Sequence, residues 1–261
     1  MQRAFVAALV VGGLCSTMGT YVVLRKLSFI GDGLAHASFA GIVVAYLRNF
    51  SYYIGAGVVA VLTALAIGFV YRRGNVSLDT AIGVLFTGMF ALGVFLMSRS
   101  QRYTIDLQDY LFGNILAVTG SDLIVALALA TLVAATIALL YRPLLYCSFD
   151  PVVAQASGLN VAMLDYVLLT LLALTIIISL QTIGIILVAA LLVTPAASAA
   201  QLTSRFAPMM ATSAAIGVAC SVGGLYLSYY LHAASGATIV LLATLVFFAA
   251  LTFRRVGRRS A

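Results

Sequence analysis

Charged side chains are scarce in this chain and make up only 8% of its 261 residues. A soluble domain carries roughly 25% charged residues, so this chain has too few of them to cover a surface that faces water. Apolar residues account for 64% of the sequence, and the mean hydropathy is +1.16. Because apolar runs reach about 20 residues, the length of a membrane-spanning helix, we predict an all-α, polytopic membrane helix bundle.

Several motifs that carry chemistry are also missing. No glycine-rich loop ending in GK[ST] occurs, so the chain is not expected to hydrolyse ATP itself. The GxSxG and HExxH motifs are absent too, and we predict that the chain is not an enzyme. Cys15, Cys147 and Cys220 have no metal-ligand spacing and are interpreted as small core residues. All acidic residues are aspartates and only two histidines occur, too few for a buried proton relay.

The net charge of +7 does not indicate a nucleic-acid partner. The basic residues stand in small groups at the ends of apolar segments, for example Arg25–Lys26, Arg72–Arg73 and Arg254–Arg255. Basic residues in such places fix the orientation of spans in a membrane. We therefore predict contact with lipid and none with nucleic acid.

The apolar stretches predict about nine spans, with eight to ten possible. They cover residues 4–24, 29–47, 53–71, 80–98, 122–141, 162–180, 183–200, 208–231 and 236–253. The first stretch is too long for the apolar part of a signal peptide and is interpreted as an uncleaved span. Counting Lys and Arg in the loops gives about ten on one side and four on the other, which predicts an outside N-terminus and a cytoplasmic C-terminus. Within the seventh stretch, Pro195 should free a backbone carbonyl and kink the helix.

Two connections between spans are too long to be simple turns. Residues 105–116 form a moderately apolar stretch, which predicts an interfacial or re-entrant helix on the outside. On the cytoplasmic side, Asp150 followed by Pro151 is typical of a helix start, and Gly158 is typical of a helix end. These signals predict a short helix at about 150–160, which either docks a soluble partner or is an ordinary connector.

An aspartate and a histidine stand four residues apart inside the second stretch. On a helix, this spacing places Asp32 and His36 on one face, one turn apart. Ionisable residues at membrane depth are costly and usually functional, and this donor pair suits Mn, Fe or Zn. The alternative is a local Asp–His hydrogen bond that helps two helices pack. Only about six residues separate Asp32 from Lys26, which favours the cytoplasmic half of the membrane.

The sequence resembles the permease subunits of bacterial ABC-type manganese/zinc/iron uptake systems. The matching motifs run in order along nearly the whole chain. They are VLRKLSFIGDGLAHA at 23–37, YLFGNILAV at 110–118, FDP at 149–151 with SGL at 157–159, GIILVAALLVTPAA at 184–197 and SGATIV at 235–240.

The resemblance implies a single permease domain over residues 1–261, of the type II ABC-importer kind, in the bacterial inner (plasma) membrane. It implies a homodimer served by cytoplasmic ATP-binding subunits, which bind the ATP, and by an extracytoplasmic metal-binding protein. The helix at 150–160 would be the coupling helix that contacts the ATPase. In that helix, Asp150, Pro151, Ala154 and Gly158 are the expected coupling residues. Asp32 and His36 would contact the transported ion, which the resemblance makes a substrate and not a cofactor.

Two features of the match leave alternatives open. His232 stands where the family often has an aspartate, and it is either a contact for the arriving metal or a tolerated surface change. The segment 179–184 is more similar to the manganese branch than to the zinc branch, so Mn²⁺ is favoured, Zn²⁺ is next and Fe²⁺ is possible. A competing function is a secondary metal carrier that is driven by an ion gradient and has no ATPase partner.

Overall fold

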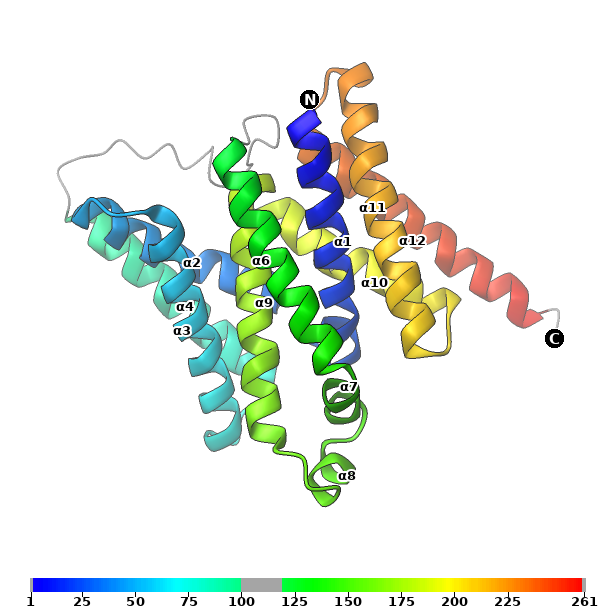
Figure 1. Ribbon diagram of the computed structural model, residues 1–261, viewed down its shortest axis with the longest axis horizontal. Helices are drawn as coiled ribbons and strands as arrows, with labels where there is room; N and C mark the ends of the chain where they lie inside the picture. Colours follow the sequence, from blue (N-terminus) through cyan, green and yellow to red (C-terminus); the bar gives the residue numbers. More distant parts are fainter. Residues whose placement is uncertain (1, 100–118, 260–261) are drawn as a thin grey trace. The chain divides into compact units, whose positions relative to one another are not determined.

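The computed structural model describes residues 2–99 and 119–259, and all regular elements there are α-helices (Figure 1). They are α1 (Gln2–Leu24), α2 (Ile30–Arg48), α3 (Tyr52–Arg73), α4 (Leu78–Ser98), α6 (Gly120–Leu139), α7 (Tyr141–Phe149), α8 (Pro151–Ala156), α9 (Val161–Ile183), α10 (Ile185–Leu202), α11 (Phe206–Leu231) and α12 (Ser235–Arg259). Nine of these helices are long and apolar enough to cross a membrane, which confirms the predicted bundle for the described part of the chain. The predicted helix at 105–116 lies outside the described residues.

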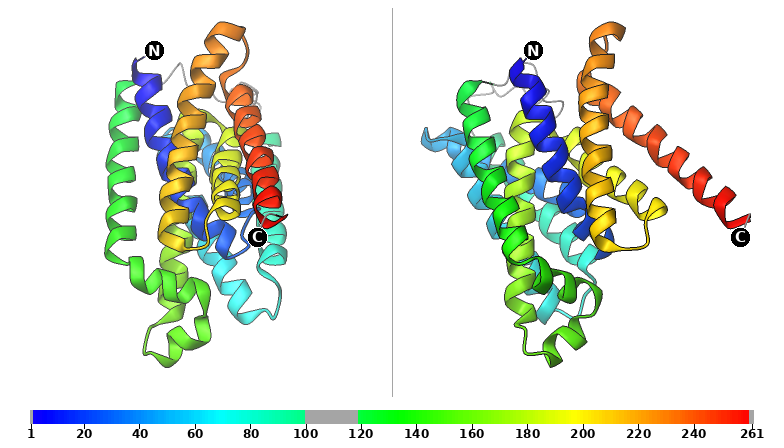
Figure 2. Two further views of the ribbon diagram at one scale, coloured as in Figure 1. Left: turned by 90° about the vertical axis from the view of Figure 1, so that its right-hand side faces the viewer. Right: turned by 45° about the vertical axis from the view of Figure 1, so that its right-hand side comes forward.

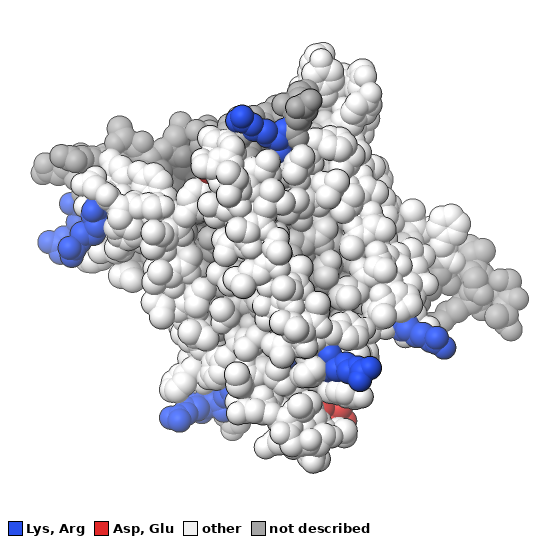
Figure 3. Space-filling view, in the orientation of Figure 1, with Lys and Arg blue, Asp and Glu red and all other residues white. Residues whose placement is uncertain are grey.

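The surfaces of the long helices are apolar where they face outward. Leu241, Leu245 and Phe248 lie along one face of α12 and are more than half exposed. On the face shown in the space-filling view, Lys and Arg side chains form a few separate patches near its margins, and most of the described surface between them carries no charged side chain (Figure 3). Such surfaces are stable against lipid, which is as apolar as the side chains themselves.

By their internal contacts, the described residues divide into two compact units. One unit holds residues 2–28, 119–130 and 178–259, and the other holds residues 29–99 and 131–177. Helices α6 and α9 each contribute residues to both units. The boundary between the sixth and seventh spans, predicted between residues 180 and 183, lies slightly later, at Gly184, whose positive φ of 83° separates α9 from α10.

In the first unit, α1 lies beside α10 and α11, and small residues allow the helices to approach closely (Figure 2). A Cβ on Gly19 of α1 would collide with the Leu192 carbonyl of α10. Pro195 lies inside α10 and cannot donate a hydrogen bond to Leu191, as predicted. The freed Leu191 carbonyl accepts a hydrogen bond from Ser16 Oγ of α1, at 3.4 Å. Thus α1 satisfies the backbone group that the proline leaves unpaired.

In the second unit, α2 and α3 form an antiparallel pair joined by a short turn. Gly41 and Gly55 face each other so closely that a Cβ on either would collide with the carbonyl of the other. Asn49 ends α2 in the left-handed conformation, with φ 55°. Close backbone approach of this kind is how helices associate where no hydrophobic driving force exists between them.

We expect Gly41→Val to destabilise the protein by about 3 kcal/mol, because the new side chain must push α3 away. Thermal unfolding of the purified transporter should shift to lower temperature. The matched control is Gly57→Val on α3, since a Cβ there meets no atom within 4 Å. Equal unfolding temperatures for the two variants would contradict the close contact of α2 and α3.

The same unit contains the short helices α7 and α8, which precede α9 (Figure 1). Asp150 caps α8, because its Oδ1 accepts hydrogen bonds from the backbone N–H groups of Val152 and Val153, both at 3.0 Å. Gly158 has φ 83° and follows the last turn. The sequence signals for a short capped helix are therefore present in the structure, and the helix spans Pro151–Ala156.

Candidate functional site

The first fourteen residues of α2 are enclosed except at two positions. From Ile30 to Val43, all residues are buried other than Asp32 and His36. The side chain of Asp32 is 50% exposed and that of His36 is 26% exposed. Asp32 and His36 are therefore the two partly exposed positions in this otherwise buried stretch of α2.

Asp32 and His36 contact each other, as their spacing predicts. His36 Nδ1 lies 3.3 Å from Asp32 Oδ1 and 2.9 Å from the Asp32 backbone carbonyl oxygen. Both neighbours are hydrogen-bond acceptors, so Nδ1 must carry the proton in order to donate. A neutral imidazole protonated at Nδ1 presents a lone pair at Nε2, which is the usual arrangement of a metal-binding histidine.

The register of the neighbouring helices places this pair level with the middle of α3 and α4. Counting from the Gly41–Gly55 contact in the antiparallel pair, His36 lies level with Ala60 and Asp32 with Ala64. On the other side, His36 contacts Phe86 and Phe90, which flank the centre of α4. The pair therefore lies farther from the helix ends of α3 and α4 than its distance in sequence from Lys26 had indicated.

The structural alternative for the pair is also visible. Asp32 lies in the first turn of α2, where a carboxylate interacts favourably with the helix dipole. Moreover, the described residues contain no group of three or more His, Cys, Asp or Glu that could hold a metal ion. Asp32 and His36 of one chain therefore supply only part of a coordination sphere.

His232 has a clear backbone role. It follows the last residue of α11 in the left-handed conformation, with φ 50° and ψ 36°, and its cap N–H donates to the Ser228 carbonyl. Its side chain is exposed. Its position agrees with the surface alternative, and its contact with metal stays a prediction.

The four expected coupling residues mainly shape α8. Asp150 and Pro151 begin the helix, Gly158 follows its end, and Ala154 is only 1% exposed. The sequence did not single out the exposed apolar residues, of which Val152 is 77% exposed and Val153 is 55% exposed. Tyr146 and Phe149 at the end of α7 are exposed as well. The sequence signal that could have pointed to these four residues is the predicted cap at Asp150, because all of them stand within four positions of it. The structure adds that they are exposed.

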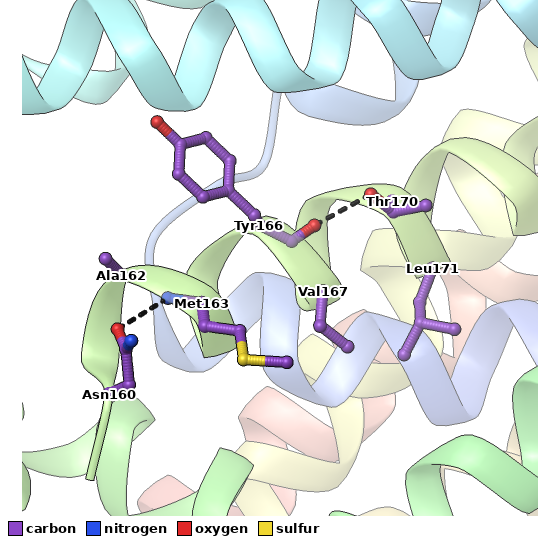
Figure 4. A pocket seen from close by; sticks show the side chains of 7 residues that line it. All are labelled: Asn160, Ala162, Met163, Tyr166, Val167, Thr170 and Leu171. Carbon is purple, nitrogen blue, oxygen red and sulfur yellow. Dashed lines mark hydrogen bonds between the residues drawn. The ribbon is translucent and has the colours of Figure 1, made fainter.

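A shallow groove of about 500 Å³ runs along the first half of α9 (Figure 4). Its lining is Asn160, Ala162, Met163, Tyr166, Val167, Thr170 and Leu171. Asn160 Oδ1 accepts a hydrogen bond from the Met163 N–H, and Thr170 Oγ1 donates to the Tyr166 carbonyl. The groove has no carboxylate or imidazole, so its lining does not provide the donors expected at a site for a divalent metal ion.

Comparison with known proteins shows the family to which the chain belongs. The chain matches the ABC 3 transport family over residues 1–254. The protein belongs to the ABC 3 transport family. As a member of this family, it is the membrane permease subunit of an ABC transporter and not its catalytic subunit, and it is a multi-pass protein of the bacterial plasma membrane.

Relatives in and near the family cover almost the whole chain. The chain is 45% identical over 253 residues to the manganese transport system membrane protein MntC of Halalkalibacterium halodurans, which covers 97% of this chain and 87% of the relative. It is 37% identical over 260 residues to a probable iron transport system membrane protein of Haemophilus influenzae, covering 99% and 95% of the two chains. The solved structure of PsaBC from Streptococcus pneumoniae in complex with Fab is similar, with a TM-score of 0.83, 34% identity and coverage of 95% and 90%.

Proposed function

We propose that this permease conducts a divalent transition metal ion into the cytoplasm, driven by ATP hydrolysis on partner subunits. The observation that carries the proposal is the partly exposed Asp32–His36 pair, level with the middle of α3 and α4, in an ABC 3 family member. Mn²⁺ is the favoured ion, because the relative at 45% identity is named for manganese transport. Zn²⁺ comes next, and the iron-named relative keeps Fe²⁺ in the range.

The site is completed by a second copy of the chain. One copy offers Nε2 of His36 and the carboxylate oxygen of Asp32 that His36 does not contact, which is too few donors for Mn²⁺. In a homodimer with two-fold symmetry, a site on the axis receives each donor twice, which gives four ligands. A site of this size binds the ion weakly enough to release it, as a transport pathway requires.

The energy for transport comes from outside the chain. Cytoplasmic ATP-binding subunits bind at α8. The exposed side chains of Val152 and Val153 are more stable in an apolar recess of the ATPase than in water. An extracytoplasmic metal-binding protein delivers the ion to the opposite face. We infer from the distribution of Lys and Arg that the N-terminus lies outside and that α8 and the C-terminus lie in the cytoplasm.

The chain connection from α8 to α9, followed by contacts of α9 with α3 and of α3 with α2, links α8 with the Asp32–His36 pair inside the second unit. Helix α9, which follows α8, packs Tyr166 and Leu169 against Gly68 of α3. Arg72 near the end of α3 donates to Asp165 Oδ2 of α9 at 3.0 Å. Helix α3 in turn packs on α2 through the two facing glycines. We propose that movement of α8 reaches Asp32 and His36 along these contacts.

We expect Arg72→Asp to weaken the metal stimulation of ATP hydrolysis about 2- to 5-fold, since it replaces the α3–α9 ion pair by two like charges. ATP hydrolysis by the reconstituted transporter, with and without Mn²⁺, measures this effect. The double variant Arg72→Asp with Asp165→Arg restores an ion pair of opposite direction and should recover most of the stimulation. If the double variant is no better than the single one, the ion pair does not take part in coupling.

The experiment that tests the proposal is a metal panel on the reconstituted transporter with its ATPase and binding protein. We expect Mn²⁺ to stimulate ATP hydrolysis at the lowest concentration, followed by Zn²⁺ and Fe²⁺. If the chain forms no complex with an ATPase and accumulates metal only when an ion gradient is imposed, it is a secondary carrier. The comparisons lend that alternative no support.

A further inference from the structure

Two glycines bring α2 and α4 close together on either side of His36. A Cβ on Gly33 of α2 would lie 2.8 Å from Ile82 Cγ2 of α4. A Cβ on Gly93 of α4 would lie 2.8 Å from Phe39 Cδ1 of α2. Because each contact leaves no room for a side chain, the helices run nearly in contact over this length. The two contacts also show that α2 and α4 run in the same direction.

Between these two contacts, aromatic rings of α4 fill the space next to His36. The Phe90 ring meets the imidazole edge to face, with centroids 5.6 Å apart and an interplanar angle of 75°. The Phe86 ring lies 6.1 Å away at 60°. Phe90 is held in turn by Phe39 of α2, at 5.5 Å. Rings at such distances and angles attract each other beyond the effect of area burial alone.

These contacts act on the imidazole from a different direction than Asp32 does. The hydrogen bond to the Asp32 carbonyl holds the Nδ1 edge, at 2.9 Å. The two phenylalanines contact the ring from α4 and limit its rotation about the side-chain bonds. No hydrogen bond or ion pair with a described residue involves Nε2, so the contacts on the ring leave this nitrogen available as a ligand.

We propose that Phe86 and Phe90 form an aromatic bracket that positions His36 for metal binding. The bracket does not touch the ion. It holds the imidazole in the binding orientation before the ion arrives, so that less side-chain freedom is lost on binding. This inference rests on the proposed function, because it requires that His36 binds the transported ion.

The test measures Mn²⁺ uptake against Mn²⁺ concentration, with the complete transporter in cells that lack other manganese importers. Phe90→Leu keeps an apolar side chain and removes the ring. We expect the KM for Mn²⁺ to rise about 2- to 10-fold, with a Vmax per transporter close to that of the unchanged protein. Phe90→Tyr keeps the ring and should restore the KM to within about twofold.

The matched control is Phe95→Leu, the same substitution on the same helix. Phe95 is 57% exposed, and among the described residues no aromatic ring contacts it. We expect its KM to equal that of the unchanged protein. If Phe90→Leu has the same KM as Phe95→Leu, or lowers only Vmax or the amount of assembled transporter, the bracket does not position His36 and the inference is wrong.

A third variant separates this inference from the function on which it rests. If His36→Ala abolishes uptake while Phe90→Leu behaves like Phe95→Leu, the bracket is wrong and the metal site stands. If His36→Ala leaves uptake unchanged, the metal site itself is wrong, and the bracket falls with it.

Discussion

Replacing His36 by alanine should lower Mn²⁺ uptake by more than ~100-fold at limiting metal. We expect no other substitution proposed for the metal pathway to have a larger effect on uptake. Loss of a group that only orients a metal ligand typically costs about 10- to 100-fold in affinity, and loss of the ligand itself should cost more. In a two-fold dimer, each substitution also removes two ligands at once. Uptake of radiolabelled Mn²⁺ in cells without other manganese importers measures the effect.

Asp32→Ala should reduce uptake about 10- to 100-fold, because it removes an oxygen ligand and the carboxylate next to His36 Nδ1, while the backbone carbonyl that also accepts from Nδ1 remains. His232→Asn is the control for both variants, since it removes the other histidine and asparagine also accepts the left-handed conformation at a helix end. We expect it to leave uptake unchanged. If His36→Ala transports as well as His232→Asn, the site has been assigned to the wrong residues.

Placing a charge on the exposed face of α8 should separate the permease from its ATPase. Val152 is 77% exposed at the start of α8, and Val152→Asp would bury an unpaired carboxylate in the proposed interface. A substitution at a hot-spot residue of an interface costs ~2 kcal/mol or more, and ~2 kcal/mol corresponds to about 30-fold in association. Co-purification of the ATPase with the tagged permease measures the loss.

The control for this variant keeps the apolar surface. Val152→Ile retains a β-branched apolar side chain at the same place and should copurify with the ATPase as well as the unchanged protein does. Ala154 is not a suitable test position, because it is buried and a bulky charge there would disrupt α8 itself. If Val152→Asp retains the ATPase, the interface does not include this face of α8.

Hydropathy predicted the helices of this protein because each span must satisfy its backbone hydrogen bonds within itself. Short sequence signals were sufficient to predict features that neighbouring residues determine, such as the start and end of a helix. Asp150 caps α8 and Gly158 follows it in the left-handed conformation, both as predicted. The break at Gly184 and the carbonyl freed by Pro195 are equally local.

What depends on contacts between helices was beyond the sequence. The count of residues from Lys26 favoured one half of the membrane for Asp32, whereas the Gly41–Gly55 contact places it level with the middle of α3. Ala154 was expected to be a coupling residue, and only the structure shows that it is buried whereas Val152 and Val153 are exposed. Nothing in the sequence marks Phe90 as a neighbour of His36, because only the packing of α2 on α4 brings the two rings together.

The most direct test is Mn²⁺ accumulation by proteoliposomes that contain the complete transporter, with the binding protein and radiolabelled Mn²⁺ on one side and ATP on the other. The proposed function predicts accumulation that requires ATP, needs no ion gradient, and is abolished by His36→Ala but not by His232→Asn. Accumulation without ATP under an imposed gradient, or ATP-driven accumulation that His36→Ala leaves intact, would contradict it.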